Sequence, residues 1–150
     1  MCFKLRLRIL LAGLWWGSLT GLGFVVVPML FANLETPAIA GAMAARLFTA
    51  QTWLSIGCAM LLLLSYGKKD AAGANPWAEP AIKFIVAGLF LAVLVEFGVS
   101  PRIVAARTVG ADLKLWHGLG SAMYFAQWLC AGISFWLLGK PDTSTSSNAD

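Results

Sequence analysis

The stretch ILLAGLWWGSLTGLGFVVVPMLFANL, residues 9–34, contains no charged side chain from its first position to its last. A helix needs about 20 mostly apolar residues to cross the hydrocarbon core of a bilayer. The apolar core of a secretory signal peptide is shorter, about 7–15 residues, and ends at a cleavage site of small residues. We therefore predict that this stretch is an uncleaved transmembrane helix, which follows a basic N-terminal segment over residues 1–8.

The rest of the chain holds three more apolar stretches suited to spanning a bilayer, residues 47–67, 84–100 and 115–139. The second helix is expected to begin earlier, at Thr36 and Pro37, since threonine caps helix N-termini and proline suits the first helical position. The tail, residues 140–150, lacks large apolar side chains and is expected to be disordered. These features predict an all-α integral membrane four-helix bundle over residues 9–139.

The connection between the third and fourth predicted helices, residues 101–114, mixes basic side chains with Ile103, Val104 and Val109. A short helix lying in the membrane surface commonly has this mixture. We therefore expect either such an interfacial helix or a loop at this position.

The composition excludes several classes of protein. Hydrophobic residues make up 59% of the chain and charged residues 12%, whereas a soluble domain carries about 25% charged residues. We therefore expect the protein surface to be in contact with the lipid bilayer. The net charge of +4 is spread along the chain and forms no basic stripe for a nucleic acid. We find no P-loop, GxSxG, Rossmann or HExxH pattern and no cysteine pairs for a metal. The question of enzymatic activity is left open, with a non-enzymatic role favoured.

The distribution of lysine and arginine predicts the orientation, because these residues accumulate on the cytoplasmic side of a membrane. The side that both chain ends share has seven of them: Lys4, Arg6, Arg8, Lys68, Lys69, Lys83 and Lys140. The other side has four: Arg46, Arg102, Arg107 and Lys114. We predict that both termini are cytoplasmic.

Three glycines in the first helix, Gly13, Gly17 and Gly21, recur every fourth residue and so share one helical face. Small residues on one face let another helix approach closely in lipid. The favoured interpretation is packing within the bundle, and the alternative is an interface with another copy or another membrane subunit.

Ionisable and polar side chains from different helices are predicted to meet at the outer, non-cytoplasmic side. Charge inside a membrane costs about 2.5–3.5 kcal/mol on insertion scales, so it is usually paired or functional. We expect Glu96 to form a salt bridge with Arg46 or Arg102. The whole predicted cluster consists of Arg46, Gln51, Glu96, Arg102, Arg107, His117, Ser121 and Tyr124.

The fourth predicted helix carries a polar stripe, since His117, Ser121, Tyr124 and Trp128 are three or four residues apart. The favoured interpretation is hydrogen bonding between helices. The alternatives are a path for protons or substrate and a haem site that uses His117. His117 is the only histidine, so one chain cannot supply two histidine ligands to haem, and no other metal-ligand spacing appears.

Residues along most of the chain, 9–137, resemble the transmembrane protein 205-like family, whose bacterial members form a domain of unknown function. The first half contributes Trp16-Gly17, Phe24, Val27-Pro28, Leu30-Phe31, Leu34, Ala40-Gly41 and Leu47-Phe48. The second half contributes Ser100-Pro101-Arg102, Ala106-Arg107, Leu115, His117, Ser121 and Gln127. The resemblance implies a four-helix membrane domain without an established enzymatic activity, and its animal members are associated with drug resistance and secretion.

Together these features favour a non-enzymatic, multi-pass protein of a bacterial inner membrane that assists transport or stress resistance. The alternatives are a membrane redox or haem protein that uses His117, and an accessory subunit that packs through its glycine face. No resident cofactor or metal is expected under the first hypothesis.

Overall fold

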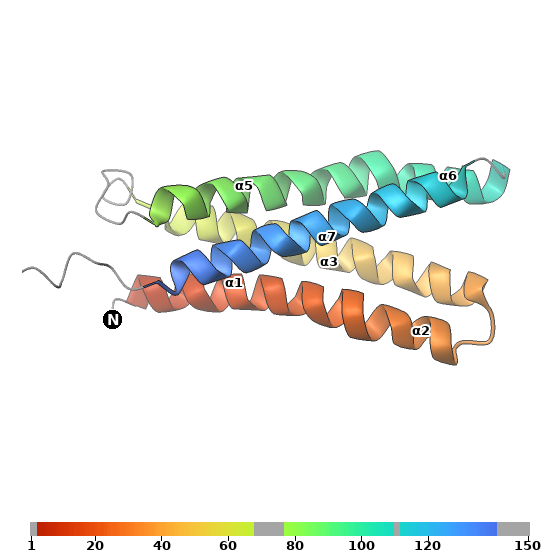
Figure 1. Cartoon of the computed structure of the whole chain (residues 1–150), viewed down its shortest axis with the longest axis horizontal. Helices are drawn as coiled ribbons and strands as arrows, with labels where there is room; N and C mark the ends of the chain where they lie inside the picture. The colour runs from red at the N-terminus through yellow and green to blue at the C-terminus, as the bar shows by residue number, and fades with distance from the viewer. Residues whose placement is uncertain (1–2, 68–76, 110–111, 141–150) are drawn as a thin grey trace, which may run out of the picture.

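A computed structural model describes residues 3–67, 77–109 and 112–140, and the side chains of all of these except 107–109. Within them every regular element is helical, and the helices form four long rods side by side (Figure 1). The predicted all-α four-helix fold is thus confirmed. The predicted disordered tail lies outside the described residues from position 141 onward.

The first two rods are joined by a tight turn. The first consists of α1 (Phe3–Gly21), the π-helical turn η1 (Leu22–Val26) and α2 (Val27–Asn33). The second is α3 (Pro37–Ser65). As predicted, Thr36 caps α3, because its side chain accepts a hydrogen bond from the backbone N–H of Ile39.

The third rod consists of α5 (Ala78–Leu94), the π-helical turn η2 (Val95–Val99) and α6 (Ser100–Val109), and the fourth is α7 (Leu113–Leu138). The predicted short helix in the connection 101–114 is present as α6, but it is not separate from the third helix, and its position at the membrane surface stays a prediction. The helix α6 instead continues α5 through η2, because Pro101 widens the helix by one residue without breaking it. The candidate membrane span therefore runs unbroken over Ala78–Ala106.

The two π-helical turns have the same origin in the sequence. Each is followed by one residue and then a proline, Pro28 after Val27 and Pro101 after Ser100. A proline ring clashes with the carbonyl of residue i−4 and has no N–H to donate. The preceding residue bonds one position further back, so Val27 donates to Leu22 and Ser100 donates to Val95. The wider turn accommodates the proline within a continuous helix.

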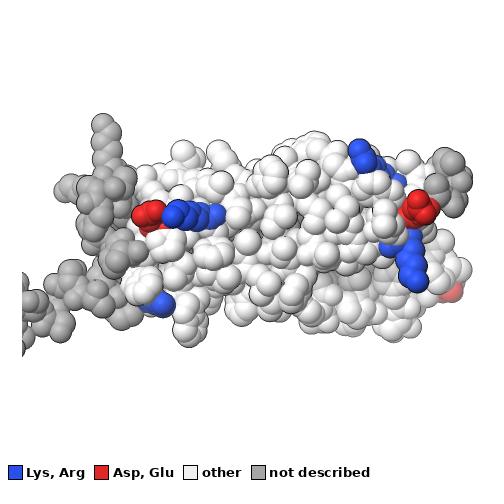
Figure 2. All heavy atoms as spheres, turned by 45° about the horizontal axis from the view of Figure 1, so that its top comes forward, with Lys and Arg blue, Asp and Glu red and all other residues white. Residues whose placement is uncertain are grey.

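The surface of the bundle is apolar along its middle and charged at its two ends (Figure 2). Large side chains such as Leu64, Phe90 and Trp53 are mostly exposed. The four rods span 26–31 residues, each sufficient to cross a bilayer. Since a soluble protein rarely exposes such a continuous apolar surface, the chain is a multi-pass membrane protein.

Tryptophans of α1 hold the bundle together by filling the space above glycines. Trp15 is fully buried, and a Cβ added to Gly88 of α5 would lie only 2.7 Å from its ring. Likewise, a Cβ on Gly132 of α7 would lie 2.9 Å from the ring of Trp16. The absent side chain of Gly132 lets α1 pack against its neighbour α7 with the Trp16 ring between the two backbones, and that of Gly88 lets the Trp15 ring reach across the core to α5.

The predicted glycine face of the first helix packs only at its start. Gly13 lies beneath the ring of Phe135, whereas nothing beyond the local helix backbone comes within 4 Å of a Cβ on Gly17 or Gly21. The interpretation that all three glycines pack within the bundle is therefore wrong for Gly17 and Gly21. Because α1 rotates its two tryptophans toward its neighbours, this edge of the helix is left open. The alternative interface with another copy stays a prediction.

Arg8 connects the beginning of α1 to the end of α3. In the sequence, Arg8 serves only to predict the orientation in the membrane and has no predicted structural role. Its Nε donates to Ser65 Oγ at 2.9 Å, and its Nη2 donates to the Ser65 carbonyl at 2.6 Å. The guanidinium also lies 4.1 Å from the centroid of the Tyr66 ring. A cation at the last carbonyls of α3 is favoured by the helix dipole, so Arg8 is a structural clamp.

Candidate functional site

A cavity of about 380 Å³ lies among all four rods. It occupies the half of the bundle where α2 ends and α7 begins, which we call the distal half (Figure 1). The segments η1, α2, α3, η2, α6 and α7 all contribute to its walls. Its size falls within the range of small-molecule sites, about 300–1,000 Å³.

The π-helical turn η2 brings Glu96 to the wall of this cavity. The hydroxyl of Thr49, on α3, donates to the two carboxylate oxygens at 3.1 and 3.5 Å. The predicted salt bridge is wrong, since among the described side chains Glu96 forms no ion pair with Arg46 or Arg102. The hydroxyl of Thr49, on the facing helix, occupies the place expected for a cation.

The arginines of the predicted cluster lie elsewhere. The side chain of Arg46 is exposed and does not line the cavity. Arg102 is also exposed, with its guanidinium 4.8 Å from the centroid of the Trp116 ring. The side chain of Arg107 lies outside the described residues. Neither Arg46 nor Arg102 therefore supplies a positive charge to the cavity wall.

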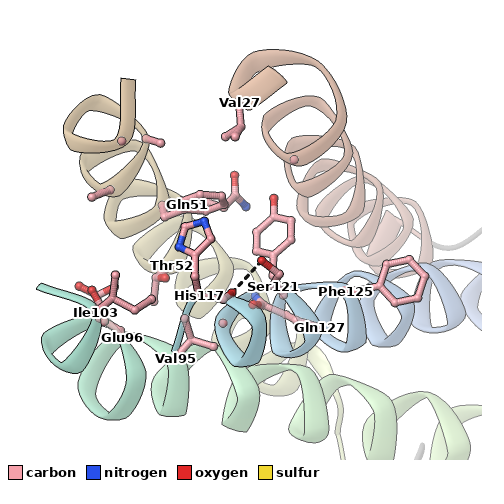
Figure 3. Close-up of a pocket in the computed structure, with 18 of the residues that line it drawn as sticks. Val27, Gln51, Thr52, Val95, Glu96, Ile103, His117, Ser121, Phe125 and Gln127 are labelled. Atoms are coloured by element: carbon pink, nitrogen blue, oxygen red, sulfur yellow. Dashed lines mark hydrogen bonds between the residues drawn. The ribbon is translucent and has the colours of Figure 1, made fainter. Parts of the chain in front are cut away.

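His117 faces the cavity from the first turns of α7, between Gln51 and Glu96 in the close-up view (Figure 3). Its backbone carbonyl accepts a hydrogen bond from Ser121 Oγ at 2.9 Å. Its imidazole has no hydrogen-bond partner among the described residues. The ring therefore presents both nitrogens to whatever enters the cavity.

The inner end of the cavity is fixed by hydrogen bonds between helices. The amide of Gln51 donates to Ser18 Oγ at 2.9 Å, and the hydroxyl of Tyr124 donates to the Leu19 carbonyl at 2.8 Å. The ring of Tyr124 also lies against Gly23, where a Cβ would come within 2.7 Å. For Tyr124 the favoured interpretation, hydrogen bonding across helices, is confirmed.

Trp128 makes the same kind of contact deeper in the bundle, since its Nε1 donates to the Thr20 hydroxyl at 2.8 Å. Aromatic rings of Phe24, Phe31, Phe48 and Phe125 form much of the remaining cavity wall. Phe48 meets Tyr124 edge to face, with 5.1 Å between ring centroids. The walls are thus apolar and aromatic, with a few polar groups at fixed positions.

The comparisons with known proteins give a family but no function. Residues 10–112 match DUF4149, a domain of unknown function. The chain belongs to the DUF4149 family. No curated protein and no solved structure matches the chain. The matched region of this DUF4149 chain ends directly before α7, the helix that carries His117, Ser121 and Tyr124.

The structure of this DUF4149 protein brings together five of the eight predicted cluster residues and adds others. Gln51, Glu96, His117, Ser121 and Tyr124 all line the cavity. Sequence reasoning missed Thr49, which bonds Glu96, and the buried amide of Gln127, which also lines the cavity. Gln127 follows Tyr124 by three residues and Trp128 follows it by four. Both spacings place a residue on the same helical face as Tyr124, so the sequence could also have predicted Gln127 as part of the site.

The chemistry available in the cavity of this DUF4149 protein is a carboxylate, an imidazole, amides and hydroxyls within aromatic walls. No group of three or more histidine, cysteine, aspartate or glutamate side chains comes together among the described residues. The cavity thus combines a wide apolar part with few polar groups, a combination that is common in small-molecule sites.

Proposed function

We propose that this protein binds a small, mostly apolar molecule in the distal cavity and thereby assists its transport. The observation that carries the proposal is a cavity of about 380 Å³ inside a membrane-spanning bundle, where side chains normally fill the interior. The resemblance to the transmembrane protein 205-like family, whose animal members are associated with secretion and drug resistance, supports the same function.

The placement of polar groups supports binding rather than catalysis. The hydroxyl of Tyr124 and the amide of Gln51 are held by bonds to Leu19 and Ser18, so these groups act as fixed points of the wall. The ionisable side chains among the described cavity residues are Glu96, His117 and Tyr124, and the hydroxyl of Tyr124 is already bonded to Leu19. A binding role needs shape and a few oriented polar groups, and both are present.

A cavity-filling substitution tests this function. Ala45 lines the cavity from α3 and is exposed toward it, so Ala45→Trp should occupy part of the space without disturbing the core. Wild type purified in mild detergent should carry a discrete small molecule by native mass spectrometry, and Ala45→Trp should lose it. The matched control is Leu64→Trp, on the exposed surface at the opposite end of α3. Equal occupancy in all three proteins would refute the proposal.

We also propose that the protein resides in a bacterial inner membrane with both termini in the cytoplasm, so that the cavity opens in the outer half. The excess of lysine and arginine on the side of the chain ends supports this orientation. Reporter fusions after Asp150 and within residues 68–80 should both report a cytoplasmic location. A periplasmic signal from either fusion would contradict the orientation.

A haem-binding role is the second candidate function, and the unpartnered imidazole of His117 favours it. His117 would bind the haem iron, and the aromatic walls would pack against the macrocycle. Titration with haemin should then shift its absorption maximum in wild type but not in His117→Ala, while Ser121→Ala should behave as wild type. Identical spectra for wild type and His117→Ala would eliminate this alternative.

A further inference from the structure

The carboxyl group of Glu96 lies inside a membrane span, and no side chain of opposite charge pairs with it among the described residues. It belongs to the span Ala78–Ala106 and is half-buried in the cavity wall. Its described partner is the neutral hydroxyl of Thr49. A charge at such a position is unfavourable unless an opposite charge approaches it, and one hydroxyl compensates only part of the lost hydration.

The cavity contains nothing that would attract an anion strongly. Neither lysine nor arginine lines it among the described residues. An anionic molecule would therefore meet the Glu96 carboxylate without a cation to offset the repulsion.

The walls suit a cation that has an apolar body. Phe24, Phe31, Phe48, Tyr124 and Phe125 come from three of the four rods and surround the same space. The face of an aromatic ring attracts a cation, and the attraction increases where water is excluded. Aromatic walls together with one carboxylate form the arrangement that recognises an amine or another cation with apolar substituents.

We propose that the ligand of the distal cavity is an apolar organic cation whose positive charge is neutralised by Glu96. This inference rests on the proposed function, because it names the chemical class of the molecule bound in that cavity. The Thr49 hydroxyl holds the carboxylate toward the space, and the aromatic rings contact the apolar substituents of the cation. His117, on the facing helix, is available as a second polar contact.

Two probes of nearly the same shape and opposite charge test this inference. Tetraphenylphosphonium is an apolar cation, and tetraphenylborate is the corresponding anion. In equilibrium dialysis against detergent-purified wild type, with empty micelles as the blank, the cation should bind at least about tenfold more tightly than the anion. Equal binding, or tighter binding of the anion, would overturn the inference without the need for any variant.

The substitution Glu96→Gln removes the charge with little change of shape. It should weaken tetraphenylphosphonium binding by about tenfold or more, since removal of one member of a desolvated charge pair is costly. Glu35→Gln is the matched control, because Glu35 is exposed in the turn before α3 at the same end of the bundle and does not line the cavity. It should leave the affinity unchanged. Loss of cation binding in both variants, or in neither, would overturn the assignment to Glu96.

The outcome for Ala45→Trp separates this inference from the function on which it rests. If Ala45→Trp abolishes binding of both probes while Glu96→Gln changes neither, the cavity binds small molecules but does not select cations, and only the present inference fails. If Ala45→Trp leaves binding of both probes unchanged, the probes do not enter the cavity and the proposed function fails as well. Circular dichroism and gel filtration of each variant verify that it is folded.

Discussion

The substitution Gly88→Ala tests whether rings over glycines determine the packing of this bundle. An added Cβ would lie 2.7 Å from Trp15 Cη2, 3.0 Å from Cζ2 and 3.3 Å from Cys130 Cβ. The side chain of Trp15 is fully buried, so its rigid ring has little free space into which it can move. We expect Gly88→Ala to push α5 away from the Trp15 ring or to force Trp15 from its preferred rotamer.

The magnitude follows from two opposing effects. Overpacking a well-packed core costs about 1–3 kcal/mol, whereas replacement of a helical glycine by alanine gains about 0.8–1 kcal/mol. The matched control is Gly57→Ala in α3, where nothing lies within 4 Å of the new Cβ, so it receives the gain alone. Gly88→Ala should therefore be less stable than Gly57→Ala by about 1–3 kcal/mol, the overpacking cost.

The assay is unfolding in mixed detergent micelles with increasing dodecyl sulfate, followed by far-ultraviolet circular dichroism. Trp15→Phe removes the ring atoms that the new Cβ would meet, so the double substitution should be less destabilised than the sum of the two single ones. Equal stability of Gly88→Ala and Gly57→Ala, or strict additivity in the double variant, would refute the proposed packing.

Three further substitutions test other contacts. Arg8→Met should destabilise the protein by at least about 1.5–3 kcal/mol, the value of one hydrogen bond to a charged group, because it removes two bonds to Ser65. The exposed Arg6→Met is the control in the same unfolding assay, and an equal effect would contradict the structural role of Arg8. Tyr124→Phe should cost about 0.6–1 kcal/mol through loss of its interhelical hydrogen bond, and a stability equal to that of wild type would show that this bond contributes nothing. Gly17→Leu should not destabilise the monomer, because open space surrounds it. A fall in mass by light scattering would identify an interface between copies, and unfolding of the monomer would contradict the described packing.

The four spans were predictable because each rests on a property of one segment alone. An uncharged run of sufficient length has few alternatives to a transmembrane helix, and the cap at Thr36 depends only on the residues beside it. The π-helical turns were also encoded locally, by Pro28 and Pro101, but no structural consequence of either proline was predicted from the sequence. The π-helical turn η2, which precedes Pro101, lets α6 continue the third helix.

The contacts between helices were less predictable, since they depend on how each helix is rotated about its axis. Regular spacing singled out Gly17, which is open, whereas Gly88 and Gly132 stand alone in their segments and were overlooked. Depth in the membrane correctly placed Glu96 and His117 in one half of the bundle, but depth does not specify which side of a helix faces inward. For that reason the sequence predicted an arginine as the partner of Glu96, whereas in the structure the partner is Thr49.

The most direct test of the central claim is to capture the occupant of the cavity in living cells. The photoreactive residue p-benzoylphenylalanine would replace Phe48, which lines the cavity, or Phe90, which is exposed on the outer surface of α5. After irradiation, mass spectrometry of the peptides should show one defined small-molecule adduct at position 48 and only membrane lipid adducts at position 90. The same lipid adducts at both positions would contradict the claim that the distal cavity is a specific binding site.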